Sequence, residues 1–335
     1  MKKLFYLFIL LISWSVVFSA EPVNPSSNED VKKVLNYLVG LKGKGVLTGQ
    51  ENLADDVTKW TNEVFELTGE FPALLGEDFS YGSEAFKKRL NVVSASVEQW
   101  KQGGLVTISW HQVNPDTWDG SSDEGEFKDT QKAMSRERFH QLLQDTTAIH
   151  KKYLAHIDTV ATYLKMLKDS GVVVLWRPYH EMNGGWFWWG AKPEFKTLWK
   201  LMYDRFTTYH RLNNLIWVWT PNIYNPIAEF YPGDDYVDIV GMDGYPNGVR
   251  NWDQEKVLQN ELNEIKALSK NGVIALSEVG WLPDMDWLES KRPEIVWFLC
   301  WWTHLTEENT EAQIKQVYHH PYAINRDRVN WKSTR

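Results

Sequence analysis

Acidic and imidazole side chains follow several short apolar runs of this sequence. The run 172–176 is followed, after three residues, by His180 and Glu181, and a second run, 273–276, is followed, after Ser277, by Glu278. A continuous apolar run is typical of a strand that is buried on both faces. Carboxylic acids and imidazoles placed at the ends of such strands can move protons or attack a bound molecule, so we interpret them as candidate catalytic groups.

Glu181 and Glu278 together predict a specific chemistry. Two carboxylic acids in a tryptophan-lined cleft suit the hydrolysis of a glycosidic bond. One acid must be protonated at the working pH, which apolar surroundings and a neighbouring carboxylate favour by raising its pKa. The other must be ionised to attack the anomeric carbon. The aromatic cluster from Trp186 to Trp189 follows two glycines, and we expect it to form a wall of the sugar cleft.

The elements that must position these residues recur along the chain. Eight short apolar runs read as strands: 45–50, 71–79, 105–112, 172–177, 214–221, 238–245, 273–280 and 297–302. Helical patterns lie between nearly all of them: 31–39, 57–67, 83–102, 136–169, 193–211, 252–270 and 307–318. Alternating strands and helices predict parallel pairing, and eight repeats predict an α/β fold, a single (β/α)8 TIM barrel.

A barrel of this kind explains where the polar residues fall. Its open face is built at the carboxyl ends of the strands, and five candidates lie at predicted strand ends: His111, Glu181, Asp243, Tyr245 and Glu278. Pro178 cannot donate to a sheet ladder. Regular pairing of the fourth strand should therefore end near Arg177, which leaves Glu181 on the rim. A long polar loop, 114–135, follows the third strand, and loops of that length are usually functional or mobile.

The first residues have the pattern of an export signal. Lys2 and Lys3 precede an apolar run over 4–18, and small residues follow at Ser19 and Ala20. The run is shorter than the roughly 20 residues that a membrane-spanning helix needs. We therefore expect residues 1–20 to be a signal peptide and residues 21–335 to form one domain. The expected location is secreted or periplasmic, without a membrane anchor once the signal is removed.

Composition excludes some classes of partner. The formal net charge of −8 becomes −10 when Lys2 and Lys3 leave with the signal, which argues against binding to nucleic acid. Cys300 is the only cysteine, so an intramolecular disulfide is impossible. A large core can absorb many of the 19 tryptophans; their clustering after Glu181 is the stronger indication of sugar stacking. We expect a monomer.

The sequence resembles glycoside hydrolase family 26, a clan A family dominated by β-mannanases. The signature is Arg177-Pro-Tyr-His-Glu-Met-Asn-Gly-Gly-Trp-Phe-Trp-Trp-Gly190. Three further motifs match in the expected order: Ser109-Trp-His-Gln-Val-Asn-Pro115, Asp243-Gly-Tyr245 and Leu276-Ser-Glu-Val-Gly280. The likeness extends from about Gly45 to the last helix. It implies that 21–335 is a (β/α)8 glycoside hydrolase catalytic domain.

The resemblance also implies roles for individual residues. Glu181 would be the acid/base and Glu278 the nucleophile of a retaining endo-β-1,4-mannanase that hydrolyses mannan, glucomannan or galactomannan by double displacement. The substrate-binding residues implied are His111, His180, Trp186, Asp243, Tyr245 and Trp301. Among these, Tyr245 would hydrogen-bond the nucleophile, and His180 would orient the site. Retention implies carboxyl groups about 5–5.5 Å apart.

Several alternatives stay open at this point. Other family activities are a mannobiose-releasing exo-mannanase, a β-1,3-1,4-glucanase and a β-1,3-xylanase, and a different class is a non-catalytic carbohydrate-binding barrel. A metal site built from His111, His180, Glu181 and Asp243 is a third interpretation. Neighbouring residues of an extended segment point to opposite sides, and no spaced ligand pair accompanies them. We therefore expect neither a metal nor a cofactor.

Overall fold

The strands form one parallel sheet that closes on itself, as the computed structural model shows. The structure describes residues 19–81, 85–118, 127–224, 226–245 and 256–334. The predicted signal peptide, 1–20, lies outside this part of the chain except for its last two residues. Within the described residues no helix has both the length and the apolar character needed to cross a membrane.

The strand order confirms the predicted barrel. The strands are β1 (Val46–Leu47), β2 (Gly49–Glu51), β3 (Leu74–Asp78), β4 (Leu105–Trp110), β5 (Val174–Pro178), β6 (Leu215–Trp219), β7 (Ile239–Gly244), β8 (Ile274–Val279), β9 (Ile295–Cys300) and β10 (Ala323–Ile324). Successive strands pair from β2 to β9, and β9 returns to pair with β1 and β2. The first predicted strand, 45–50, is thus split into β1 and β2, and β10 pairs with β1 at its outer side.

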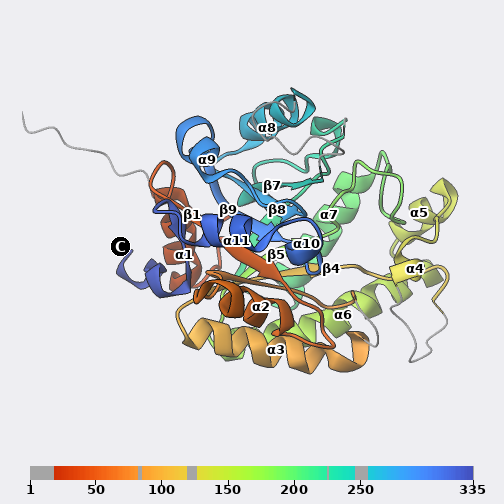
Figure 1. The fold of residues 1–335 in the computed structure, drawn as a ribbon. Helices are drawn as coiled ribbons and strands as arrows, with labels where there is room; N and C mark the ends of the chain where they lie inside the picture. Colours follow the sequence, from red (N-terminus) through yellow and green to blue (C-terminus); the bar gives the residue numbers. More distant parts are fainter. Residues whose placement is uncertain (1–18, 82–84, 119–126, 225, 246–255, 335) are drawn as a thin grey trace, which may run out of the picture.

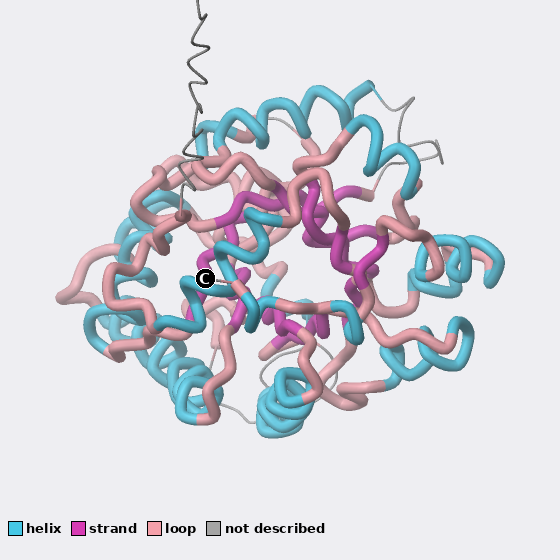
Figure 2. The backbone as a smooth tube through the Cα atoms, turned by 90° about the vertical axis from the view of Figure 1, so that its left-hand side faces the viewer, coloured by secondary structure: helices cyan, strands magenta, loops and turns pink. Residues whose placement is uncertain are grey.

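Helices cover the outside of the barrel, as Figures 1 and 2 show. They are α1 (Glu29–Gly40), α2 (Lys59–Thr68), α3 (Ala85–Lys101), α4 (Phe127–Thr130), α5 (Arg136–Leu142), α6 (Ala148–Asp169), α7 (Phe195–Asp204), α8 (Lys256–Leu268), α9 (Met285–Lys291), α10 (His304–Glu307) and α11 (Glu311–Tyr318). The predicted helix 136–169 is two helices, α5 and α6. The end of the predicted helix 193–211 is a π-helix, Arg205–Tyr209.

Helix ends follow local chemistry in several places. Thr147 caps α6, its side chain accepting a hydrogen bond from the backbone N–H of His150. Thr310 and Gln313 form a reciprocal capping box at the start of α11. These side chains satisfy backbone donors that the first turn of a helix leaves without partners. The long α6 therefore begins at a defined residue.

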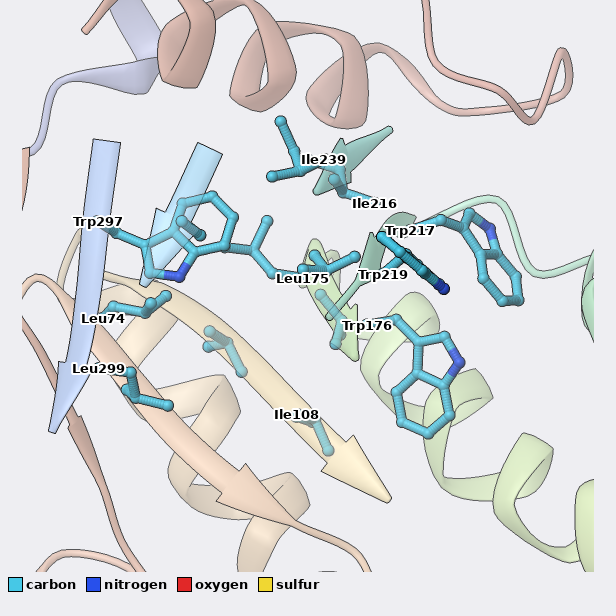
Figure 3. Close-up of a cluster of buried hydrophobic side chains, with 14 of the residues drawn as sticks. Leu74, Ile108, Leu175, Trp176, Ile216, Trp217, Trp219, Ile239, Trp297 and Leu299 are labelled. Carbon is cyan, nitrogen blue, oxygen red and sulfur yellow. The ribbon is translucent and has the colours of Figure 1, made fainter. Parts of the chain in front are cut away.

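Large aromatic side chains fill the space between strands and helices. Trp176, Trp217 and Trp219 are fully buried, and Figure 3 shows them beside the short strands that carry them. The ring of Trp217 lies 4.8 Å from that of Tyr203 on α7. Side chains alternate across a strand, so Arg177 points to the barrel interior because its neighbour Trp176 points outward. The tryptophan-rich core fixes which residues reach the site.

Candidate active site

Glu278 lies at the end of β8 and receives hydrogen bonds from two other strands. Arg177, on β5, donates from Nη2 to Oε1 of Glu278 over 2.5 Å, and the hydroxyl of Tyr245, which follows β7, donates to Oε2 over 2.8 Å. Arg177 also donates from Nη1 to Oδ2 of Asp243 over 3.1 Å. Burial, together with the charge of Glu278, raises the pKa of Tyr245. The phenol therefore stays protonated and can keep donating to the Glu278 carboxylate.

The sheet itself brings Asp243 and Glu278 side by side. They are register partners across β7 and β8, at a point where the register shifts between Met242 and Asp243. Both carboxyl groups are buried, and the Arg177 side chain that joins them is 1% exposed. A buried carboxylate needs a counter-charge or hydrogen bonds to stay ionised. Arg177 supplies both, so this arrangement suits a carboxylate that acts in its charged form.

Glu181 lies beyond the end of β5 in a different environment. Asn222 donates from Nδ2 to its Oε1 over 2.6 Å, and Trp186 donates from Nε1 to its Oε2 over 2.7 Å. Burial and the charge of Glu278 raise the pKa of Glu181 to about 7, although the bonds from Asn222 and Trp186 oppose the rise. Near neutral pH this carboxyl group is therefore partly protonated, which suits a group that donates and then recovers a proton.

The backbone around Glu181 is unusual for residues other than glycine. Tyr179 has φ 49° and Glu181 has φ 54°, both in the left-handed region. The segment is therefore a turn and not the extended stretch that we expected after Pro178. The N–H of Glu181 donates to the carbonyl of Thr220 at the end of β6, over 2.8 Å. Pro178 is the last residue of β5, as its missing donor predicted.

Two histidines stand beside the glutamates. The rings of His111 and His180 are T-shaped to one another with centroids 4.4 Å apart. Nδ1 of His111 lies 2.8 Å from Oδ2 of Asp78. Burial and the charges of Arg177 and His111 lower the pKa of His180 well below its ordinary value. His180 is therefore neutral, and its Nε2 lies 3.6 Å from Oε1 of Glu278.

Aromatic rings surround His111 on several sides. Their centroids lie 5.0 to 6.0 Å from its own, and they belong to Tyr81, Phe127, Phe187 and Trp301. Trp186 is only partly buried. The expectation that Trp188 and Trp189 also form the cleft wall is wrong, because both are fully buried. Their indole N–H groups donate to the carbonyls of Gln112 and His180, so these two rings support the site from behind.

The structure gathers the predicted site residues but adds others that the sequence reading missed. Asn222 and Asp78 were not singled out, although both occupy strand ends, the position that marked the other candidates. Arg177 was expected only to mark the end of the fourth strand, and it proves to bind two carboxylates at once. Treating every polar residue at or just after a strand end as a candidate would have found Asp78, Arg177 and Asn222.

One cluster has the spacing of a metal site. Single ligand atoms of His180, Asp243 and Glu278 lie within 4.8 Å of one another. The guanidinium of Arg177 already binds both carboxylates, and a divalent cation there would face that fixed positive charge. Among the described residues a second group, Asp286, Glu289 and His320, is mostly exposed. These arrangements give no reason to assign a metal to the reaction.

A parallel (β/α)8 barrel that holds two unlike glutamates and a cluster of aromatic rings at its strand ends is the architecture of a glycoside hydrolase. Residues 23–328 match the model of Glycosyl hydrolase family 26, and the chain belongs to this family. A curated relative, named mannan endo-1,4-beta-mannosidase, from Thermothelomyces thermophilus is 34% identical over 331 residues. The match covers 93% of this chain and 64% of the relative, so the chain spans less than two thirds of that protein.

Solved structures agree with this assignment. The structure of GH26A from a Muricauda species superimposes with a TM-score of 0.83 at 34% identity, covering 92% of this chain and 99% of that one. A beta-mannanase from a symbiotic protist of the termite Reticulitermes speratus, solved in complex with gluco-manno-oligosaccharide, has a TM-score of 0.79 at 29% identity. That match covers 93% of this chain and 98% of the other.

Proposed function

We propose that this protein is a retaining endo-β-1,4-mannanase that hydrolyses mannan, glucomannan or galactomannan. The observation that carries the proposal is the difference between the two glutamates. Glu181 accepts hydrogen bonds from two neutral donors and has a pKa raised to about 7. Glu278 accepts one from a buried arginine and one from a phenol. Environments that separate two carboxyl groups in this way assign one as acid/base and the other as nucleophile.

In the first step the protonated Glu181 carboxyl gives its proton to the glycosidic oxygen. The Glu278 carboxylate attacks the anomeric carbon from the opposite face, the bond to the leaving oxygen breaks, and a covalent glycosyl-enzyme forms. In the second step the Glu181 carboxylate takes a proton from water. The resulting oxygen attacks the same carbon and displaces Glu278, which restores both groups and the original anomeric configuration.

The remaining predicted residues support this chemistry. Tyr245 donates directly to Glu278, and Arg177 joins Asp243 to Glu278, so these side chains orient and stabilise the nucleophile. His111 and the neutral His180 line the floor beside it and can hydrogen-bond sugar hydroxyl groups. Trp186 donates a hydrogen bond to Glu181 and is only partly buried, so part of its ring can meet sugar. Trp301 is the sugar-stacking residue implied by the family resemblance; it lies 6.0 Å from His111 between ring centroids and is 6% exposed.

The substrate assignment follows the relatives. The curated relative is named for mannan hydrolysis, and one structural neighbour was solved with a gluco-manno-oligosaccharide. A matching role for this chain is degradation of β-mannan polysaccharide outside the cytoplasm, after removal of residues 1–20, by a monomer. Intact-mass analysis of the protein recovered from culture medium or periplasm tests the removal. A mass that retains residues 1–20 would contradict it.

The activity is tested by offering mannan, barley mixed-linkage glucan and β-1,3-xylan side by side. We expect rapid release of reducing ends from mannan alone, and cleavage of mannohexaose to oligosaccharides of several lengths. Release of mannobiose only would show that the enzyme is an exo-mannanase and not an endo-mannanase. Glu181→Ala and Glu278→Ala serve as matched inactive controls, and activity that persists in both would reject this site.

A further inference from the structure

The segment that carries Glu181 needs support beyond the barrel. Tyr179 and Glu181 both adopt left-handed backbone angles, a conformation that costs roughly 1–2 kcal/mol for each residue with a Cβ atom. Such strain persists only where the surroundings enforce it. Two backbone contacts hold the turn at Glu181, from its N–H to Thr220 and from Gly184 N–H to its carbonyl. The Tyr179 hydroxyl gives the same turn a side-chain contact with Gln112 and Tyr153.

A buried polar network receives the Tyr179 side chain. Its hydroxyl donates to Oε1 of Gln112 and lies 3.1 Å from the hydroxyl of Tyr153. Nε2 of Gln112 lies 3.2 Å from Nδ1 of His156, and the carbonyl of Gln112 accepts from Trp188 over 2.8 Å. All of these side chains are buried. The network joins the turn to the end of β4 and to helix α6.

The members of this network do not change charge in the range where such an enzyme works. Burial and the charge and hydrogen bond of Tyr153 raise the pKa of Tyr179, so the phenol remains a donor. Burial and the charges of Arg89 and Lys152 lower the pKa of His156 to about 3. The ring of Trp118 packs edge-on against His156 with centroids 4.1 Å apart. The network therefore offers fixed geometry rather than proton transfer.

We propose that Tyr179 is a positioning residue for Glu181, acting through Gln112, Tyr153 and His156. The inference rests on the proposed role of Glu181 as acid/base. A phenylalanine at 179 would fill the same space, so the hydroxyl serves to orient the side chain and not to fill the core. Without it the turn loses the side-chain bond that fixes its first left-handed residue, and Glu181 is presented less accurately to the leaving oxygen. Small misplacements of a catalytic group have large effects on rate.

The test is Tyr179→Phe, compared on two substrates by kcat/KM. Mannohexaose has a poor leaving group and needs the proton of Glu181, whereas 2,4-dinitrophenyl β-mannobioside has a leaving group that departs without one. We expect a loss of about tenfold or more on mannohexaose and less than about twofold on the activated substrate. Tyr203→Phe is the matched control, since it removes a hydroxyl that donates to the carbonyl of Val23 over 2.8 Å. It should change neither value.

Gln112→Met provides a second variant that keeps the backbone carbonyl for Trp188 and removes both side-chain bonds. We expect the same selective loss. An equal loss on both substrates in the two variants, as general disorder of the site would cause, overturns the proposal, and so does an unchanged rate on mannohexaose. The Glu181→Ala variant distinguishes a failure of the acid/base assignment of Glu181 from a failure of the positioning role of Tyr179. If it loses kcat/KM equally on both substrates, the acid/base assignment itself is wrong, whatever Tyr179→Phe does.

Discussion

The indole of Trp186 donates a 2.7 Å hydrogen bond from Nε1 to Oε2 of Glu181. This bond ties an aromatic residue of the site to the carboxyl group proposed to protonate the leaving oxygen. It also favours the ionised form of that group, because a donated hydrogen bond stabilises a carboxylate. Together with Asn222, it limits how far burial and Glu278 can raise the pKa of Glu181.

The pH dependence of catalysis should report this balance. In the unsubstituted protein kcat/KM should fall as pH rises through about 7, the pKa of Glu181, because the acid form is lost. Asn222→Ala removes a donor that stabilises the carboxylate, so the descending limb should move to higher pH. The measurement is a pH profile of kcat/KM on mannohexaose. A limb that stays in place or moves to lower pH would contradict the assignment of that limb to Glu181.

Stability should depend on pH through the same group. The folded-state pKa of Glu181, about 7, lies above the ordinary 4.5. The contribution of Glu181 to the free energy of unfolding is therefore fully present below pH 4.5 and is lost as pH rises through 7. The free energy of unfolding of Glu181→Gln, relative to that of the unsubstituted protein, should rise by about 3 kcal/mol between pH 4.5 and pH 8, at about 1.36 kcal/mol per pKa unit. Urea unfolding of both proteins at pH 4.5 and pH 8 measures this change, and the same difference between the two proteins at both pH values would disprove it.

Arg177 should matter as much to the fold as to the reaction. Arg177→Met leaves Asp243 and Glu278 buried without their shared cation, which we expect to cost about 3–5 kcal/mol at pH 7. Arg205→Met is the control, because its partner Asp158 is 37% exposed and such surface pairs contribute about 0–1 kcal/mol. Urea unfolding compares the two. Similar small losses would show that Arg177 is not the counter-charge of the buried pair.

Tyr245→Phe should slow the reaction without unfolding the protein. Loss of its hydrogen bond to the Glu278 carboxylate is expected to lower kcat about 10- to 100-fold, since bonds to charged groups contribute about 1.5–3 kcal/mol. Tyr231→Phe is the matched control, because that hydroxyl also donates to a carboxylate, Asp234, over 2.9 Å. The measurement is steady-state kcat of both variants on mannohexaose. An equal effect of the two substitutions would contradict the role of Tyr245 in orienting Glu278.

The barrel was predictable because its signal is repetitive. Eight apolar runs that alternate with helical patterns are enough to predict parallel strands and to place His111, Asp243 and Glu278 at one end of the barrel. Boundaries were less certain where local backbone choices decide them. The break between β1 and β2 at Thr48 and the π-helix at the end of α7 leave no clear pattern in the sequence.

The finer geometry of the site was not predictable from residue order. Glu181 sits in a left-handed turn, and only the fold shows that Asn222 and Trp186 reach its two oxygens. Trp188 and Trp189 could not be told from the partly buried Trp186, because adjacent aromatic residues look alike in a sequence. Their burial depends on tertiary contacts with Gln112 and His180.

Mass spectrometry of a trapped glycosyl-enzyme tests the central claim most directly. A 2-deoxy-2-fluoro β-mannobioside with a dinitrophenyl leaving group should form a long-lived ester, because the fluorine slows both steps and the good leaving group restores only the first. Peptide mapping should place one 2-deoxy-2-fluoro-mannobiosyl group on Glu278 and none on the Glu278→Ala variant. A label on Asp243 or Glu181, or turnover of mannohexaose with inversion and no covalent adduct, would contradict the account.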